Sequence, residues 1–464
     1  MGKKLKLGIA ILLVFSTFLM AAQTTITYAV RNWDVDTAKQ EIAEFNKIYP
    51  NIKVEMITFD ANLNEFLTAR VAAGQPLPDV MTGWEGFPFL VTQGWLYPFD
   101  EFVANDADWK YVPATIRDAF KYNGKTYAIP WDLHFHSIVV NLDLLEQLNL
   151  PKPAYNWTID QFKSLARKAT TREYSGINHL WEFDAVMAGV MDPKSAIYGF
   201  DPSLGKFRLQ NSAWASAIAL QKELKSIPGL VSDDLKNDQL REQGLLDDYQ
   251  KKFGKDADAF REGKVLMGFH GTWDWSWVKT VPWKFDFYPL PQDPKVGFRQ
   301  SVHVNYVIMA STTKHPKEAF AFAKFISFSP TGVTARLKIR ENFKNANGEP
   351  EPSFIIPGTM HPTVIAKFNS MKIVPEGVKY LLRNLDKTFR GDLYKVVPGW
   401  DDAIWNVIYP AAEQIRGGAD PRTIVADVEN KANQVISQAN KDFSAKLSQV
   451  EKDFIQTRKK IEGK

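Results

Sequence analysis

The 464-residue sequence contains no cysteine. Disulfide bonds, thiolate metal sites and a cysteine nucleophile are therefore excluded. A lipid anchor on a cysteine behind a leader segment is excluded for the same reason. The folded chain must be stabilised by core packing and by charges alone.

The sequence also has little net charge, with a formal value of +4 at pH 7. Three positive charges come from Lys3, Lys4 and Lys6, so removing this segment would leave +1. Clustered basic residues supply most of the affinity of proteins for nucleic acids and anionic membranes. We therefore expect no nucleic-acid partner.

Long hydrophobic runs are missing everywhere except at the N-terminus. There the basic stretch "MGKKLK" precedes the apolar run "LGIAILLVFSTFLMAA", which ends in small residues. This pattern predicts a signal peptide over residues 1–22, cleaved near Ala21 or Ala22. The alternative is a single membrane anchor, but the run is short for a span of about 20 residues and polar chain follows at once.

Low-complexity linkers, internal repeats and the P-loop, HExxH and GxSxG motifs are also absent. We therefore predict no catalytic residue and no cofactor. The composition, 45% hydrophobic and 24% charged, is that of a globular protein. Because a single core stops growing near about 250–300 residues, a chain of this length predicts two lobes.

Tryptophan, by contrast, is abundant, with 14 residues in the chain. Four of them, at positions 273, 275, 277 and 283, lie in "FHGTWDWSWVKTVPW" (269–283). Tryptophan combines a large apolar ring with a polar N–H group, so it favours wet clefts and interfaces. The segment indicates that some of these rings contact a molecule outside the chain, although packing of all four in the core is the alternative.

Residues 23–84, directly after the leader, alternate strand and helix patterns. Strands are predicted over 24–30 and 51–59 and in "PDVMTGW" (78–84), and helices over 36–49 and 61–74. This order predicts a doubly wound α/β domain, in which ligands lie beyond the carboxyl ends of the strands. The pairs Trp33–Asp34 and Trp84–Glu85 fall in such loops.

Further along, residues 126–130 and 137–141 are predicted as two strands separated by "WDLHFH". Thr158 is a candidate N-cap for the helix that follows it. Apolar residues spaced by three or four from residue 422 onward predict one long helix, or two in line, up to residue 464. We expect its first half to pack on the second lobe; its second half either packs as well or projects toward a partner.

Seven segments in this order resemble the family 1 extracellular solute-binding proteins of ABC importers, a group that includes sugar-binding proteins. The segments are 72–84, 94–102, 122–131, 139–162 with "NLDLLEQLNLPKPAYNWTIDQF", 260–273 with "FREGKVLMGFHGTW", 288–291, and 307–327 with "VIMASTTKHPKEAFAFAKFIS". The C-terminal helix is longer than is usual in the family, and residues 352–358 match it weakly.

The resemblance implies two doubly wound α/β lobes joined by a hinge with several chain crossings, the type II arrangement of periplasmic binding proteins. It places residues 23–131 plus 302–345 in the first lobe. Residues 132–300 plus 350–464, including the long C-terminal helix, fall in the second. A ligand would bind in the cleft between the lobes, which close over it.

A sugar presents apolar ring faces and an edge of hydroxyl groups, so a sugar site needs aromatic rings beside acids, amides or imidazoles. The chain repeats this pairing. The residues predicted to bind ligand are Trp33, Asp34, Trp84, Glu85, Trp131, Asp132, His134, Trp181, Trp273, Asp274, Trp277, His303, Asn305, Trp400 and Asp401.

Two details of that set depend on local geometry. If Thr272 caps a helix, Trp273 and Trp277 share a face and Trp275 points away; Trp275 and Trp283 are then assigned to the core. His134 and His136, two apart in a strand, could suggest a metal site, but no third ligand is apparent, so hydrogen bonding or packing is favoured and no metal is predicted.

The sequence thus predicts a monomeric, soluble periplasmic protein that binds a carbohydrate, an oligosaccharide in particular, and delivers it to the membrane permease of an ABC importer. One alternative is a binder of another solute such as a polyamine, which acids and tryptophan faces would also suit. A second is a secreted glycoside hydrolase, which needs two carboxylates about 5–10 Å apart; nothing in the sequence marks such a pair.

Overall fold

The computed structural model describes residues 23–463, apart from residues 61, 232–240, 242, 243, 245, 256 and 346. The predicted signal peptide, residues 1–22, lies outside the described residues. Within the described part of the chain, every helix is too short or too polar to cross a bilayer.

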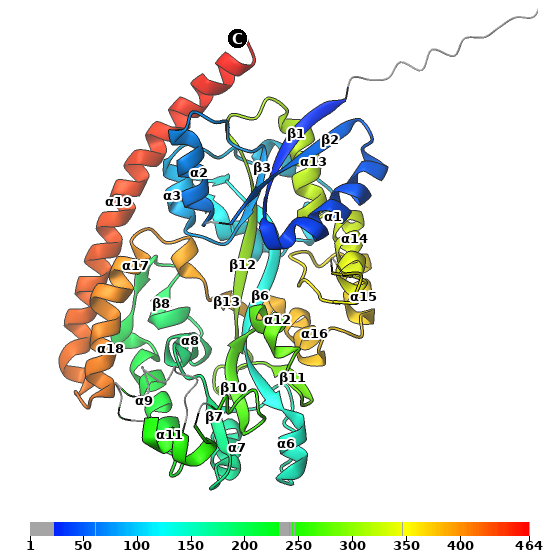
Figure 1. The fold of residues 1–464 in the computed structure, drawn as a ribbon. Coiled ribbons are helices and arrows are strands. Elements are labelled where there is room, and N and C mark those ends of the chain that lie inside the picture. Colours follow the sequence, from blue (N-terminus) through cyan, green and yellow to red (C-terminus); the bar gives the residue numbers. More distant parts are fainter. Residues whose placement is uncertain are drawn as a thin grey trace, which may run out of the picture.

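The N-terminal segment forms the predicted β-α-β-α-β unit, which confirms that part of the sequence analysis. Its elements are β1 (Thr24–Arg31), α1 (Val35–Ile48), β2 (Ile52–Phe59), α2 (Leu63–Ala72) and β3 (Val80–Gly83). Strand β1 lies between β2 and β3 and is parallel to both. Two later helices, α13 (Pro316–Ser327) and α14 (Pro330–Glu341), pack against α1 and complete this part, which we call the first lobe (Figure 1).

Two long strands connect this part to the rest of the molecule. Strand β12 (Gln300–Met309) pairs with β3 through its C-terminal half and with β6 (Ile129–Asn141) along most of its length, both antiparallel. A bulge interrupts the β6–β12 register between Val304 and Tyr306. Both strands are almost entirely buried. They are the central crossings between the two parts of the molecule in Figure 1.

The sequence analysis expected two strands here, separated by residues 131–136, and the structure shows a single strand of 13 residues instead. The interruption was wrong because the polar residues of this stretch alternate with apolar ones. Leu133 and Phe135 are buried, while Asp132 and His134 point to the other face. Such alternation is what a strand with one polar, cleft-facing side requires.

The second lobe is built around the far ends of these strands. Strand β10 (Val265–Gly271) pairs antiparallel with β6 and parallel with β7 (Ser175–Asn178), and β11 (Phe285–Tyr288) pairs with β6. The main path of the sheet is therefore β2-β1-β3-β12-β6-β10-β7, with β11 on β6 and β13 (Thr388–Arg390) on β12. Helix α7 (Ile159–Ala169) begins at the predicted Thr158 cap, with a complete capping box to Gln161.

The remaining elements are short or lie on the outside of the lobes. In the first lobe and its edge they are α3 (Phe87–Thr92), α4 (Asp100–Val103), α5 (Ala114–Arg117), β4 (Lys121–Tyr122) and β5 (Lys125–Thr126). Elsewhere they are α6 (Leu142–Gln147), α8 (Phe183–Val190), β8 (Phe200–Asp201), β9 (Lys206–Phe207), α9 (Trp214–Lys225), α11 (Leu246–Phe253), α12 (Trp275–Val278), α15 (Pro362–Ser370), α16 (Glu376–Arg383), α17 (Trp400–Ala403) and α18 (Tyr409–Arg416).

The C-terminal helix α19 (Pro421–Ile461) is one continuous element that packs on both lobes. Figure 1 shows it along the side of the molecule, past both parts. Ala432 and Ile436 are buried in the core of the second lobe, whereas Phe443 and Leu447 are buried with the residues of the first. The second half of the helix therefore packs on the molecule, which was one of the two alternatives. It packs on the first lobe, whereas the sequence analysis assigned the whole helix to the second lobe.

Polar contacts fix the last turns of α19 to the first lobe. Arg458 is buried and donates from Nη1 to the carbonyl oxygen of Thr313 at 2.6 Å, and its guanidinium lies over the ring of Tyr97. About two turns earlier, Glu451 accepts hydrogen bonds from Asn123 and Tyr127. The helix therefore bridges the two lobes on one side of the molecule.

We predict that Arg458→Ala lowers the free energy of unfolding by about 1–3 kcal/mol, because buried carbonyl groups lose a charged donor. Urea denaturation followed by circular dichroism measures the change. Lys459→Ala, one residue further along and exposed, is the matched control and should change stability by less than about 0.5 kcal/mol. Equal stabilities of the two variants would show that the end of α19 is not held on the first lobe.

Candidate functional site

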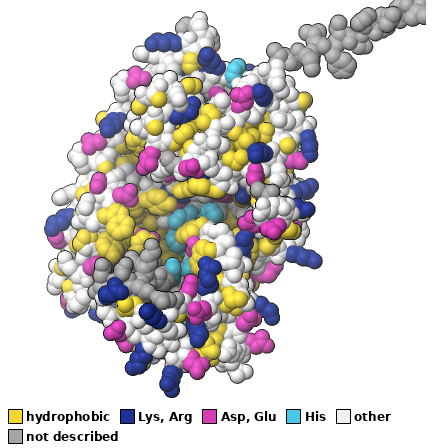
Figure 2. Space-filling model, in the orientation of Figure 1, with side chains coloured by type: hydrophobic (Ala, Val, Ile, Leu, Met, Phe, Trp, Pro, Cys, Tyr) yellow, Lys and Arg dark blue, Asp and Glu magenta, His cyan; other side chains and the backbone are white. Residues whose placement is uncertain are grey.

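A cavity of about 660 Å³ opens between the two lobes. Figure 2 shows the hollow near the middle of the visible face, with histidine side chains inside it. The residues that line it are Trp33, Asp34, Trp84, Trp131, Asp132, His134, His136, Glu182, Thr272, Trp273, His303, Asn305, Arg340, Phe354, Ile355, Ile356, Tyr394 and Lys395. Four of the predicted tryptophans are thus brought together on one cavity.

The first lobe contributes a wall of two indole rings at the ends of β1 and β3. Trp33 and Trp84 lie with their ring centroids 6.3 Å apart, and the Arg31 guanidinium lies 3.6 Å from the Trp84 centroid. Arg31 is in turn ion-paired with Glu85, whose carboxylate also accepts from the backbone N–H groups of Leu63 and Trp84. Glu85, which the sequence analysis assigned to the ligand, does not line the cavity; its oxygens are used to hold Arg31 and the Trp84 loop.

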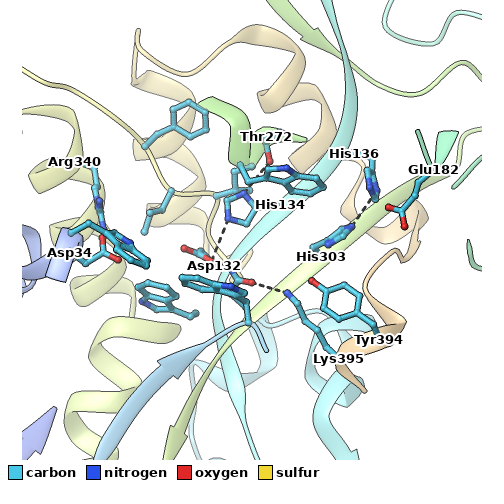
Figure 3. A pocket seen from close by; sticks show the side chains of 18 residues that line it. Asp34, Asp132, His134, His136, Glu182, Thr272, His303, Arg340, Tyr394 and Lys395 are labelled. Carbon is cyan, nitrogen blue, oxygen red and sulfur yellow. Dashed lines mark hydrogen bonds and ion pairs between the residues drawn. The ribbon is translucent and has the colours of Figure 1, made fainter. Parts of the chain in front are cut away.

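Asp34 lies at the same end of the cavity, where it forms an ion pair of 3.1 Å with Arg340 of α14. Figure 3 shows this pair at one side and Glu182 with His136 at the other. Arg340 was not singled out from the sequence, because an arginine in an amphipathic helix gives no local sign that it faces a cleft.

The floor of the cavity comes from the crossing strands β6 and β12. Asp132 accepts a hydrogen bond of 2.8 Å from the Asn305 amide, and Lys395 donates to the Asn305 carbonyl oxygen at 2.8 Å. His134 lies directly opposite His303 in the strand register. Asn305 sits at the bulge between Val304 and Tyr306, and a bulge is a common means of re-aiming a side chain into a site.

The second lobe contributes Trp273, which lies in the short 3-10 helix Thr272–Asp274 after β10. Its ring contacts those of His136 and His303, with centroids 5.1 and 4.8 Å away. The ring also folds back over Gly271, where an added Cβ would come within 2.1 Å of an indole carbon. Only glycine leaves room for this ring position, so Gly271 helps to aim Trp273 into the cavity.

The condition that Thr272 caps a helix is not met. The cap position is Gly271, and the Thr272 hydroxyl instead accepts a hydrogen bond of 3.0 Å from the backbone N–H of Phe135 in β6. Trp277 donates from Nε1 to Asp274 at 3.1 Å, and neither residue lines the cavity. Trp283 is buried and Trp275 packs against the rings of Phe285 and Phe354, as expected for core residues.

Three histidines form a connected cluster against Trp273. His136 Nδ1 lies 2.8 Å from the Ser301 hydroxyl and 3.2 Å from His303 Nε2, and His134 lies 3.3 Å from the Thr272 hydroxyl. Burial lowers the pKa of His136 to about 3, and burial together with His136 lowers that of His303 well below its usual value. The cluster is therefore neutral at pH 7 and can both donate and accept hydrogen bonds.

Metal binding by this cluster is not indicated. Among the described residues, no group of three or more His, Cys, Asp or Glu side chains is arranged to hold a metal ion.

The buried histidines predict a loss of stability in mild acid. Because the folded-state pKa of His136 lies below its ordinary value of 6.5, the unfolded chain takes up a proton first as the pH falls. Protonation of His136 in the unfolded chain should by itself lower the free energy of unfolding by about 2 kcal/mol between pH 7 and pH 5. His136→Gln should flatten the pH profile in urea denaturation, and the exposed His315→Gln should leave its slope unchanged. An equally steep profile in His136→Gln would contradict the assignment.

A smaller cavity of about 140 Å³, which we call the side chamber, adjoins the first. The two share His136, Glu182, His303 and Tyr394. The other residues of the side chamber are Ala185, Val186, Ile197, Tyr198, Gly391, Trp400, Asp401, Ile404 and Trp405. Trp400 and Asp401, predicted from the sequence, are thus placed here rather than in the main cavity.

Trp181 is placed outside both cavities, with 58% of its surface exposed, while its neighbour Glu182 lines both. The sequence analysis assigned Trp181 to the ligand site and did not include Glu182. Tyr394, Lys395 and residues 354–356 were missed altogether. Tyr394 and Lys395 lie in a single 3-10 turn (Leu393–Lys395) and residues 354–356 lie outside the helices and strands, so the local pattern does not reveal their course.

With this geometry in place, comparisons with known proteins identify the family. The family model of bacterial extracellular solute-binding proteins matches residues 34–329, well over half of the chain. The chain belongs to this family. The family consists of solute-binding proteins and not of enzymes.

Solved structures of low sequence identity share the fold. The sugar-binding protein MalE from Xanthomonas citri matches with a TM-score of 0.65 and 14% identity, over 91% of this chain and 99% of that one. A substrate-binding protein from Listeria monocytogenes in complex with cycloalternan matches with a TM-score of 0.60 and 18% identity, over 89% and 99%. The maltotriose-binding protein of Thermus thermophilus matches with a TM-score of 0.56 and 18% identity, over 89% of this chain and 99% of that one. The solute-binding protein described here therefore has the expected two-lobed α/β fold.

Proposed function

We propose that this solute-binding protein captures a carbohydrate, an oligosaccharide in particular, in the cavity between its lobes and delivers it to the permease of an ABC importer. The observation that carries the proposal is the composition of the cavity. Four indole rings, from both lobes and from the crossing strands, surround a floor of carboxylate, amide and imidazole groups. Rings suit the apolar faces of a sugar, and the polar groups suit its hydroxyls.

The ligand-binding residues we propose are those that line the main cavity, with Trp33, Trp84, Trp131 and Trp273 as the ring platforms. Asp132, His134, His303 and Asn305 would hydrogen-bond hydroxyl groups. The volume of about 660 Å³ and the adjoining side chamber favour more than one sugar ring. In support, the named structural relatives include proteins solved with cycloalternan and with maltotriose.

We further propose that the protein is a soluble periplasmic monomer, released by cleavage of residues 1–22. Its lobes, which we divide near residues 131, 302 and 345–350, would close on the sugar and present a joint surface to the permease. We expect dissociation constants in the micromolar range or tighter, about −8 kcal/mol or more favourable.

A thermal-shift screen tests the proposal, since a ligand that binds only the folded protein raises its melting temperature. Neutral mono- and oligosaccharides should stabilise the protein, and chromatography of the same mixtures should show the sugars intact. Spermidine tests the alternative that the ligand is a polyamine. This is the second candidate because the acids and tryptophan rings of the cavity would also suit a cation. Stabilisation by spermidine and by no sugar would overturn the carbohydrate assignment.

A further inference from the structure

The side chamber contains a carboxylate that has no cationic partner. Glu182 accepts one hydrogen bond, of 3.3 Å, from the hydroxyl of Tyr198, and no ion pair to it is found within the described chain. No lysine or arginine is among the residues that line the chamber. Of the other acids around the cleft, Asp34 is ion-paired with Arg340 and Glu85 with Arg31, whereas Asp132 accepts a hydrogen bond from the Asn305 amide.

The rest of the chamber also suits a positive charge. Its walls include the rings of Tyr198, Tyr394, Trp400 and Trp405, and aromatic faces attract cations. His136 and His303 are neutral, so they bring no competing charge. Burial raises the pKa of Glu182 to about 7, as expected for a carboxyl group that lacks a counter-charge and would ionise fully when one arrives.

Both residues of the Glu182–Tyr198 contact have a left-handed backbone, with φ of +56° and +55°. This conformation is costly for residues other than glycine and is found where the surrounding structure holds a functional group in place. Figure 3 shows the Glu182 carboxylate beside His136, at the end of the cavity away from Asp34. The carboxylate is therefore held at the junction of the main cavity and the side chamber.

We propose that the side chamber binds a protonated amino group at one end of the ligand, and that the ligand is accordingly an amino sugar or an oligosaccharide that ends in one. The inference rests on the proposed carbohydrate function and narrows it. The ammonium group would lie against Glu182 and the aromatic walls, while the sugar ring to which it is attached remains in the main cavity. A chamber of about 140 Å³ has ample room for such a substituent.

Isothermal titration calorimetry at pH 7 with matched ligands tests the inference. Three pairs of monosaccharides differ in one group only: glucose and glucosamine, galactose and galactosamine, and mannose and mannosamine. Glucose oligomers are compared with oligomers of equal length and linkage in which the terminal ring alone is glucosamine. We expect the amino member of at least one pair to bind about tenfold tighter or more, since a charge-assisted contact to a desolvated carboxylate is gained.

In the Glu182→Gln variant, the ratio of the dissociation constants of the neutral and the amino sugar should fall to near one. The control Glu173→Gln, which changes an exposed acid nearby in sequence, should leave this ratio unchanged. Circular dichroism checks that both variants are folded. Neutral sugars that bind as tightly as their amino partners, or a preference that survives Glu182→Gln, would overturn the inference and leave the carbohydrate function standing. Failure of all sugars, neutral and amino alike, with binding of spermidine would instead overturn the carbohydrate function itself.

Discussion

Replacing Asp392 by alanine is expected to lower the free energy of unfolding by about 3–5 kcal/mol, the cost of leaving a buried charge without its partner. Asp392 is completely buried and accepts from the backbone N–H of Val304 at 2.8 Å and from Lys395 at 3.2 Å. It is also paired with Arg390. Burial alone would raise the pKa of Asp392, but Arg390 and Lys395 hold it below its ordinary range.

Asp392 matters for the cleft as well as for stability. Lys395, only 1% exposed, connects Asp392 to Asn305 and so to the polar floor of the cavity. Urea denaturation at pH 7 measures the loss, and Asp386→Ala, on a nearby exposed acid, is the control. The double variant Asp392→Asn with Lys395→Met, which removes both charges, should recover part of the stability. A loss below about 1 kcal/mol in Asp392→Ala would show that this ion-pair network does not stabilise the hinge region.

Replacing Trp273 by alanine is expected to weaken sugar binding by about 2 kcal/mol or more, which is about 30-fold in the dissociation constant. Trp273 is the indole of the second lobe that faces Trp33 and Trp84 of the first, and 42% of its surface is free to be covered by a ligand. Removing it takes the second lobe's indole away from the main cavity. Calorimetric titration with the best sugar from the screen measures the change.

Trp181→Ala provides the matched control for Trp273. Trp181 belongs to the same lobe and is more exposed than Trp273, but lines neither cavity. Its replacement should leave the affinity within about twofold. If both variants bind the sugar as the wild type does, with unchanged circular dichroism spectra, the ring platform is not where we place it.

Much of the fold follows from local patterns in the sequence. The β1-to-β3 unit was predicted because its apolar residues repeat with the period of a helix or a strand, and α7 because Thr158 is a suitable N-cap. The unbroken course of β6 was not predicted. Its polar residues fall on one face only because a cleft lies there, and that depends on β12, which pairs with it from some 170 positions along the chain.

In the candidate site, too, the residues with a local signal were predicted and those positioned by long-range contacts were missed. Aromatic residues that follow strands, such as Trp33 and Trp84, reached the cavity because the carboxyl ends of parallel strands meet at one edge of the sheet. Glu85 did not, because its carboxylate is ion-paired with Arg31 and accepts hydrogen bonds from the backbone of Leu63 and Trp84. The long-range neighbours Arg340, Tyr394 and Lys395 carry no local signal, since only the folding of distant segments brings them together.

The structure of the protein crystallised with the sugar that gives the largest thermal shift would test the central claim most directly. We predict a sugar ring stacked on Trp273 with a second contact on Trp33 or Trp84, and hydroxyl groups within hydrogen-bonding distance of Asp132 and His134. A sugar bound elsewhere on the molecule, or within the cavity without contact to any indole ring, would contradict it.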